Sequence, residues 1–108
     1  MILHITTTAG WPVERVSPVD GDFVHCSDPG TVHLPANRLF AGRSDLVLLV
    51  VDPAGLDVRW EPGDPPIPGG PWFPHVYGSI PAPSVVAVYP FPPGPDGLFE
   101  LPAALARS

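Results

Sequence analysis

The sequence contains no lysine and a single cysteine, and both shortages narrow its range of functions. Five arginines against 11 acidic residues leave a formal net charge of −6. Nucleic-acid binding depends on a basic surface that neutralises phosphates, so broad nucleic-acid binding is not expected. One cysteine cannot form an intrachain disulfide, and nothing in the sequence indicates an oxidising compartment.

Long apolar runs are also missing. The longest, Leu46 to Val51, has the length of a strand and is far too short to cross a bilayer. The first residues, Met1 to His4, lack the basic flank and apolar core of a signal peptide. We therefore expect a soluble cytoplasmic protein without a membrane partner.

Several familiar ligand-binding signatures are absent as well. The sequence has no phosphate-binding glycine loop with its lysine, no GxGxxG dinucleotide motif and no paired-cysteine zinc pattern. Its four histidines are scattered without the spacing of metal ligands. We predict no metal site.

Proline, by contrast, is abundant, with 18 prolines in a chain that is 44% apolar. Residues 1–108 are long enough for one domain with a modest core. Each proline lacks an amide donor and fixes its own backbone angle, which excludes a helix bundle. Pro62 to Pro71 contains five prolines and three glycines, and it is predicted to be a stiff surface loop.

The apolar pattern predicts mainly strands. Leu46 to Val51 is continuously apolar, as expected for a central strand that is buried on both faces. Further strands are expected at Met1 to Thr6, Asp22 to Cys26, Leu56 to Glu61, His75 to Tyr77, Ser84 to Phe91 and Leu98 to Leu101.

Two short helices are predicted. The threonines at 6–8 offer hydroxyls that could cap a helix whose first turn includes Trp11 and Pro12. A second helix is expected within Thr31 to Ala41, where Pro35 would interrupt the register or begin a new helix. These elements predict an α+β fold, a compact split β-sheet with one or two short helices.

His25 is the first candidate for chemistry. An imidazole exchanges protons near neutral pH or donates a positioning hydrogen bond to a ligand. Alternation along the strand places His25 on the face opposite Val24 and Cys26. The structural alternative is a partly buried histidine that is hydrogen-bonded to the backbone.

The neighbours of His25 have simpler interpretations. Since adjacent strand residues point to opposite faces, His25 is badly placed to deprotonate Cys26, which we interpret as a core residue. Ser27 is expected to cap the following turn, with a hydroxyl that could reach an anion. His4 and His33 are interpreted as structural or exposed.

Polar groups in apolar surroundings supply the remaining candidates. Arg38, preceded by Asn37, lies where a helix is expected to end, and its guanidinium could clamp a phosphate or carboxylate. Trp60 could supply a stacking wall. Glu61 could act as a base or as a partner for a ribose hydroxyl or for His75. Surface ion pairs and an ordinary strand end are the structural alternatives.

His75 and Tyr77 would share one face of an extended segment, which places two polar side-chain tips on one surface. The preceding Trp72-Phe73-Pro74 would hold them rigidly, as suits a preformed site. Folding would have to bring His75 and His25 together from distant parts of the chain.

Three stretches together resemble the family known as domain of unknown function 952. They are Gly21-Asp22-Phe23-Val24-His25-Cys26-Ser27; Ala36-Asn37-Arg38-Leu39-Phe40-Ala41-Gly42-Arg43 with Asp45 to Leu49; and Arg59-Trp60-Glu61 leading to Phe73-Pro74-His75-Val76-Tyr77-Gly78. Their order and spacing cover the chain from Met1 to about Phe91.

That family is similar in fold to the ADP-ribosyltransferases, especially to the RNA 2′-phosphotransferase branch, which uses NAD as acceptor. There the site histidine follows a strand in a Val-His-Leu-Ser-like context, which Val24-His25-Cys26-Ser27 resembles. The resemblance implies an ADP-ribosyltransferase-like fold and makes NAD a candidate cofactor. The basic cluster of the phosphotransferases is missing from this acidic chain, so activity on RNA is not expected.

Together these residues predict one small-molecule pocket. We expect His25, His75 and Glu61 to be catalytic, and the ligand to be bound by Asn37, Arg38, Trp60, Tyr77 and Ser27. The favoured reaction is group transfer or acid–base catalysis on an anionic or nucleotide-like ligand, as in a transferase. Two alternatives stay open: a cofactor-independent tailoring or isomerising enzyme, and a non-catalytic ligand-binding module. The sequence does not determine the oligomeric state.

Overall fold

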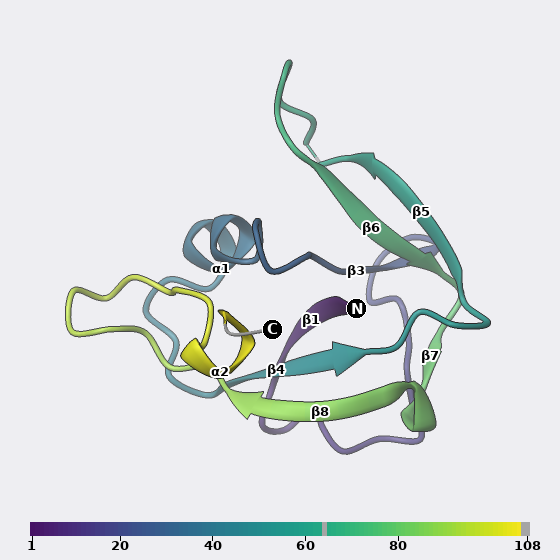
Figure 1. The fold of residues 1–108 in the computed structure, drawn as a ribbon, viewed down its shortest axis with the longest axis horizontal. Coiled ribbons are helices and arrows are strands. Elements are labelled where there is room, and N and C mark those ends of the chain that lie inside the picture. Colours follow the sequence, from purple (N-terminus) through teal and green to yellow (C-terminus); the bar gives the residue numbers. More distant parts are fainter. Residues whose placement is uncertain (64, 107–108) are drawn as a thin grey trace.

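A computed structural model describes residues 1–63 and 65–106 of the protein. The strands are β1 (Ile2–Thr7), β2 (Arg15–Val16), β3 (Phe23–His25), β4 (Leu46–Val51), β5 (Asp57–Pro62), β6 (Trp72–Tyr77), β7 (Ile80–Pro81) and β8 (Val85–Pro90). The helices are α1 (His33–Leu39), α2 (Ala103–Ala106) and the 3₁₀-helix η1 (Ala82–Ser84). The fold is a small, compact α+β fold with antiparallel strands in split sheets (Figure 1).

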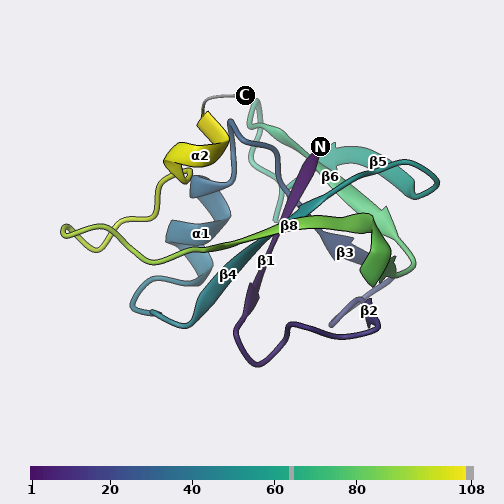
Figure 2. The ribbon, with the colours of Figure 1, turned by 60° about the horizontal axis from the view of Figure 1, so that its bottom comes forward.

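One three-stranded sheet has the order β1-β4-β8. The predicted central strand, Leu46–Val51, is confirmed as β4, and it pairs antiparallel with β1 on one side and β8 on the other. One of its faces packs against α1, α2 and the segment that contains Phe91 and Phe99. Figure 2 shows the two helices side by side on this face.

The second three-stranded sheet has the order β3-β6-β5, and a two-stranded ladder joins β2 to β7. The inner face of the β3-β6-β5 sheet contributes Val24 and Val76 to a second core. Leu49 and Val51, on the face of β4 that is turned away from the helices, belong to the same core. Main-chain hydrogen bonds of 2.7 Å in both directions between Leu3 and Ser27 link β1 to the end of β3.

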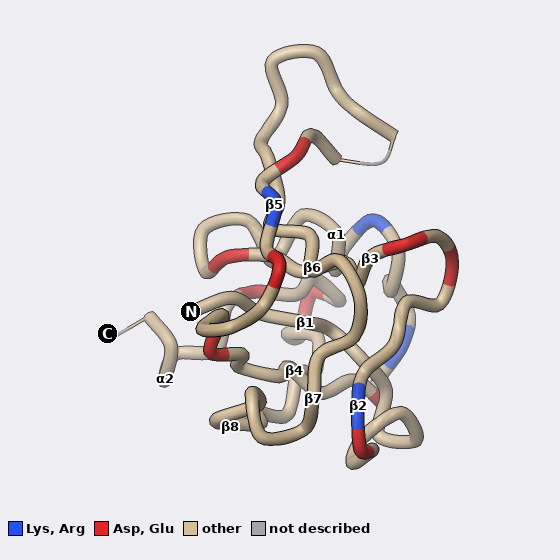
Figure 3. The backbone as a smooth tube through the Cα atoms, turned by 90° about the vertical axis from the view of Figure 1, so that its right-hand side faces the viewer, with Lys and Arg blue, Asp and Glu red and all other residues tan. Residues whose placement is uncertain are grey.

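The β5–β6 hairpin stands out from the body of the molecule (Figures 1 and 3). Its connection was predicted as the surface loop Pro62 to Pro71, and residues 65–69 are exposed. A turn closes where the Gly70 amide donates to the Ile67 carbonyl, at 2.8 Å. Gly69 adopts a φ of 72°, which favours glycine. Asp64 lies outside the described residues.

The helix predicted near Trp11 and Pro12 was wrong. The amide of Gly10 donates to the carbonyl and hydroxyl oxygens of Thr7, so this threonine closes a tight turn instead of capping a helix. The chain then crosses a cis Trp11–Pro12 bond and enters β2.

The second predicted helix is confirmed as the shorter α1, and Pro35 lies at its beginning, as one of the two predicted alternatives has it, and does not interrupt it. Pro35 is the third residue of the helix, within the first turn, where backbone amides have no acceptor inside the helix. The missing donor therefore costs the helix nothing there.

The strand predicted at Leu98 to Leu101 was also wrong, because the described backbone is irregular there. Its main chain is hydrogen-bonded by a side chain instead of a neighbouring strand. Asn37 Oδ1 accepts from the Phe99 amide at 2.7 Å, and Asn37 Nδ2 donates to the Phe99 carbonyl at 3.0 Å. No helix among the described residues is long and apolar enough to span a membrane.

Candidate functional site

The outer face of the β3-β6-β5 sheet gathers the two histidines of interest. His25 on β3 lies directly opposite His75 on β6, and Arg59 on β5 lies opposite His75 from the other side. Since side chains alternate along strands, the face that carries these three residues is opposite the face that places Val24 and Val76 in the core. The two imidazole ring centroids lie 5.4 Å apart in an edge-to-face arrangement.

A hydrogen-bond network anchors His75 within this face. Its Nδ1 lies 2.8 Å from Glu61 Oε1. The Tyr77 hydroxyl donates to both carboxylate oxygens of Glu61, at 2.8 and 3.0 Å. His75 is 3% exposed, so the imidazole is held almost entirely out of water.

This network determines where the protons lie. The hydrogen bond from His75, followed by that from Tyr77, lowers the pKa of Glu61, which is therefore a carboxylate at neutral pH. Because a carboxylate can only accept, this hydrogen bond requires a proton on His75 Nδ1. The hydrogen bond to Glu61 raises the pKa of Tyr77 and keeps the hydroxyl protonated.

Aromatic rings enclose the histidines. Phe23 stacks on His75 with ring centroids 4.0 Å apart and an interplanar angle of 15°. The same phenyl ring lies 4.7 Å from His25 and 5.2 Å from Tyr77. On the other side of the cluster, the Arg59 guanidinium lies 4.0 Å above the Tyr77 ring and pairs with Asp57 at 3.0 Å.

His25 is the solvent-facing member of the imidazole pair, since its side chain is exposed. Its backbone is held by His4 on β1, whose Nδ1 lies 2.7 Å from the His25 carbonyl oxygen and donates to it. Desolvation lowers the pKa of His4, so this support is a neutral ring at physiological pH. The predicted structural role of His4 therefore includes holding the strand that carries His25.

The structure keeps three of the predicted ligand-binding residues away from this cluster. The side-chain amide of Asn37 is hydrogen-bonded to the main chain of Phe99 and to the His33 carbonyl. Arg38 is exposed in the last turn of α1, where its charge complements the helix dipole. Trp60 alternates with Arg59 and Glu61 and so faces the opposite side of the sheet, 48% exposed.

Ser27 and Cys26 are buried beside the cluster. Ser27 belongs to the bridge to β1, and the predicted cap was wrong: the hydroxyl of Thr31 and the carboxylate of Asp28 close the following turn instead. Burial raises the pKa of Cys26 to about 12, which makes its thiol unreactive, in line with a core role.

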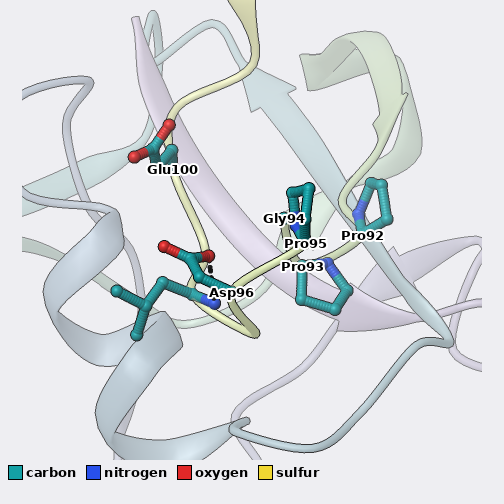
Figure 4. A pocket seen from close by; sticks show the side chains of 7 residues that line it. Pro92, Pro93, Gly94, Pro95, Asp96 and Glu100 are labelled. Atoms are coloured by element: carbon teal, nitrogen blue, oxygen red, sulfur yellow. Dashed lines mark hydrogen bonds between the residues drawn. The ribbon is translucent and has the colours of Figure 1, made fainter.

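Two cavities lie beside the C-terminal segment, and neither is lined by His25 or His75, although His33 and Asn37 line the smaller one. The larger, about 510 Å³, is formed by Pro92–Pro95 with Asp96, Leu98 and Glu100 (Figure 4). The smaller, about 280 Å³, lies between α1 and Phe99. The Asp96 carboxylate beside the larger cavity accepts a hydrogen bond from the Leu98 amide. We take the histidine cluster as the candidate site because it, unlike the two cavities, brings together an imidazole, a carboxylate and a phenol in one hydrogen-bond network.

Sequence reasoning missed two members of the cluster, Phe23 and Arg59. Phe23 precedes His25 by two residues, and period-two alternation would have placed it on the same face. Arg59 could have been found in the same way from Glu61. No group of three or more metal-ligating side chains occurs within residues 1–63 and 65–106.

These features define a small α+β protein with a Tyr–Glu–His network on the outer face of a split antiparallel sheet. The chain belongs to the family described as protein of unknown function (DUF952), whose sequence model matches residues 6–88.

The fold is similar to that of protein CC0527 from Caulobacter crescentus. Its crystal structure shares 30% sequence identity, with a TM-score of 0.80 and 97% of each chain covered. A double mutant of the same protein gives 29% identity and a TM-score of 0.81 over 97% of each chain. Its solution NMR structure gives 30% and 0.77, covering 99% of this chain and 97% of the other. No match was found among curated proteins.

Proposed function

We propose that this protein is a small-molecule enzyme that uses acid–base catalysis on the outer face of the β3-β6-β5 sheet. The observation that supports this proposal is the shared carboxylate of Glu61, which accepts hydrogen bonds from His75 Nδ1 and from the Tyr77 hydroxyl. A carboxylate that orients an imidazole and fixes its tautomer is a recurring arrangement in acid–base catalysis.

The proposed roles follow from exposure. His25 reaches solvent and is the group that exchanges a proton with the ligand. His75 lies beside it, and a proton taken up at Nε2 would make an imidazolium whose charge Glu61 stabilises. Tyr77 holds Glu61 in place by donating to both of its oxygens.

Group transfer on a nucleotide-like ligand is the first form of this proposal. Its support is the resemblance of Val24-His25-Cys26-Ser27 to the histidine segment of the RNA 2′-phosphotransferase branch, together with the proposed kinship to ADP-ribosyltransferases. Phe23 and the exposed His25 would offer ring surfaces to a nicotinamide or adenine. Calorimetric titration with NAD tests this form of the proposal. The absence of any heat of binding at millimolar NAD would rule it out.

The charges around the site favour a second candidate, a cofactor-independent tailoring or isomerising enzyme. Asp57 and Glu61 lie on the same face as the histidines, and Asp22 acts electrostatically on Tyr77. The cation Arg59 is already paired with Asp57. Acidic positions lie beside both β3 and β5 in Figure 3. An uncharged ligand would escape the repulsion that an anion meets here.

Histidine variants distinguish catalysis from simple binding. NMR titration with NAD, ADP-ribose and a panel of uncharged metabolites would identify a ligand through shifts at Phe23 and His25. His25→Ala is then expected to retain binding and lose turnover, whereas the exposed His33 on α1 supplies the control His33→Ala. Loss of binding in His25→Ala without any turnover in the native protein would instead identify a non-catalytic binding module.

A further inference from the structure

Phe23 contacts every other ring of the cluster on the outer face. Its ring stacks nearly parallel on the His75 ring, with centroids 4.0 Å apart. Its centroid lies 4.7 Å from that of His25 and 5.2 Å from that of Tyr77. Its phenyl ring carries no proton-exchanging group. Any contribution to acid–base chemistry must therefore be made through the imidazoles that it contacts.

The stacking distance restricts how the His75 ring can turn. Rotation about the Cβ–Cγ bond exchanges Nδ1 with Cδ2 and breaks the 2.8 Å hydrogen bond to Glu61. That rotation passes through an orientation perpendicular to the starting plane. A phenyl ring parallel to the imidazole at 4.0 Å leaves no room for the perpendicular state.

Phe23 also covers the imidazole end of the hydrogen bond that sets the tautomer, whereas the Glu61 side chain is 34% exposed. His75 is buried although it lies on the outer face of its sheet, so its cover comes from side chains of that face, and Phe23 lies flat on the ring. A hydrogen bond to a charged group is stronger when water is kept away.

We infer that Phe23 is a positioning residue, which fixes the plane of His75 and the approach of His25 so that the Nδ1–H tautomer persists. This inference rests on the proposed function for its meaning in catalysis. The positioning itself is a physical property of the free protein and is measurable without a substrate.

The experiment compares Phe23→Leu, Phe23→Met and Phe23→Tyr with the native protein in long-range ¹H–¹⁵N spectra of the histidine rings. Phe40→Leu is the matched control, because Phe40 is a half-buried phenylalanine that packs against the other core. We expect a single Nδ1–H tautomer for His75 in the native protein, in Phe23→Tyr and in Phe40→Leu. In Phe23→Leu and Phe23→Met we expect a tautomer mixture and about five- to tenfold faster exchange of the Nδ1 proton with water, the effect of losing an ordinary aromatic contact.

The inference is overturned if either ring-deleting variant gives a His75 spectrum and exchange rate that match those of Phe40→Leu. Two ring-deleting variants are used so that a folding defect in one leaves the other for measurement. Failure of the proposed function is seen separately, as an absence of turnover in the native protein while the His75 tautomer still depends on Phe23.

Discussion

Replacing Asn37 by alanine should destabilise the protein strongly, although the sequence alone suggested a ligand-binding role. The side chain satisfies both backbone groups of Phe99, at 2.7 and 3.0 Å, and also donates to the His33 carbonyl at 2.9 Å. Phe99 is buried and packs 5.2 Å from the Phe91 ring. Asn37→Ala would leave a buried amide and a buried carbonyl without partners.

The magnitude follows from those two groups. An unsatisfied buried donor or acceptor costs about 1–3 kcal/mol, so the pair should cost about 2–6 kcal/mol. That is a large fraction of the roughly 5–15 kcal/mol that stabilises a small domain. With a urea dependence of about 2 kcal/mol/M, the unfolding midpoint should fall by about 1–3 M.

Urea denaturation followed by circular dichroism measures this change. Arg38→Ala is the adjacent control, because this exposed side chain should alter stability by no more than about 0.5 kcal/mol. Asn37→Asp keeps the acceptor for the Phe99 amide and loses both donated hydrogen bonds, so an intermediate loss is expected. A midpoint for Asn37→Ala that matches Arg38→Ala would refute the reasoning and return Asn37 to the list of ligand-binding candidates.

Two further predictions concern titration. The pKa of Glu61 is depressed, so its contribution to stability is present above the ordinary value of 4.5 and is lost as pH falls through the folded-state pKa. Tyr77→Phe should raise the pKa of Glu61, measured by ¹³C NMR, and reduce the stability lost as pH falls below 4.5; an unchanged Glu61 titration would contradict the network. The pKa of Cys26 is raised from 9.0 to about 12, so its stabilising effect is complete below pH 9.0 and is lost as pH rises toward about 12. At neutral pH the native thiol should resist iodoacetamide and react only in urea, and rapid labelling of the folded protein would disprove its burial.

Local pattern was sufficient for much of the fold. The apolar run of β4 predicted a buried central strand, and alternation around His25 predicted correctly that Val24 and Cys26 face the core. At Pro35 local pattern left two alternatives open, because the cost of a missing amide depends on its position within the helix. Trp60 was grouped with Glu61 by adjacency, although neighbouring strand residues face opposite ways.

The α+β class, the apolar strands and the kinds of chemical group available could be predicted from the residues, because these depend on residue type and short-range periodicity. Which groups meet depends on the folded chain. Antiparallel register places His25 opposite His75, fifty residues later in the chain, and brings Glu61 to its Nδ1. Packing across the molecule likewise commits Asn37 to Phe99. Such pairings depend on strand order and register, which no local stretch of residues encodes.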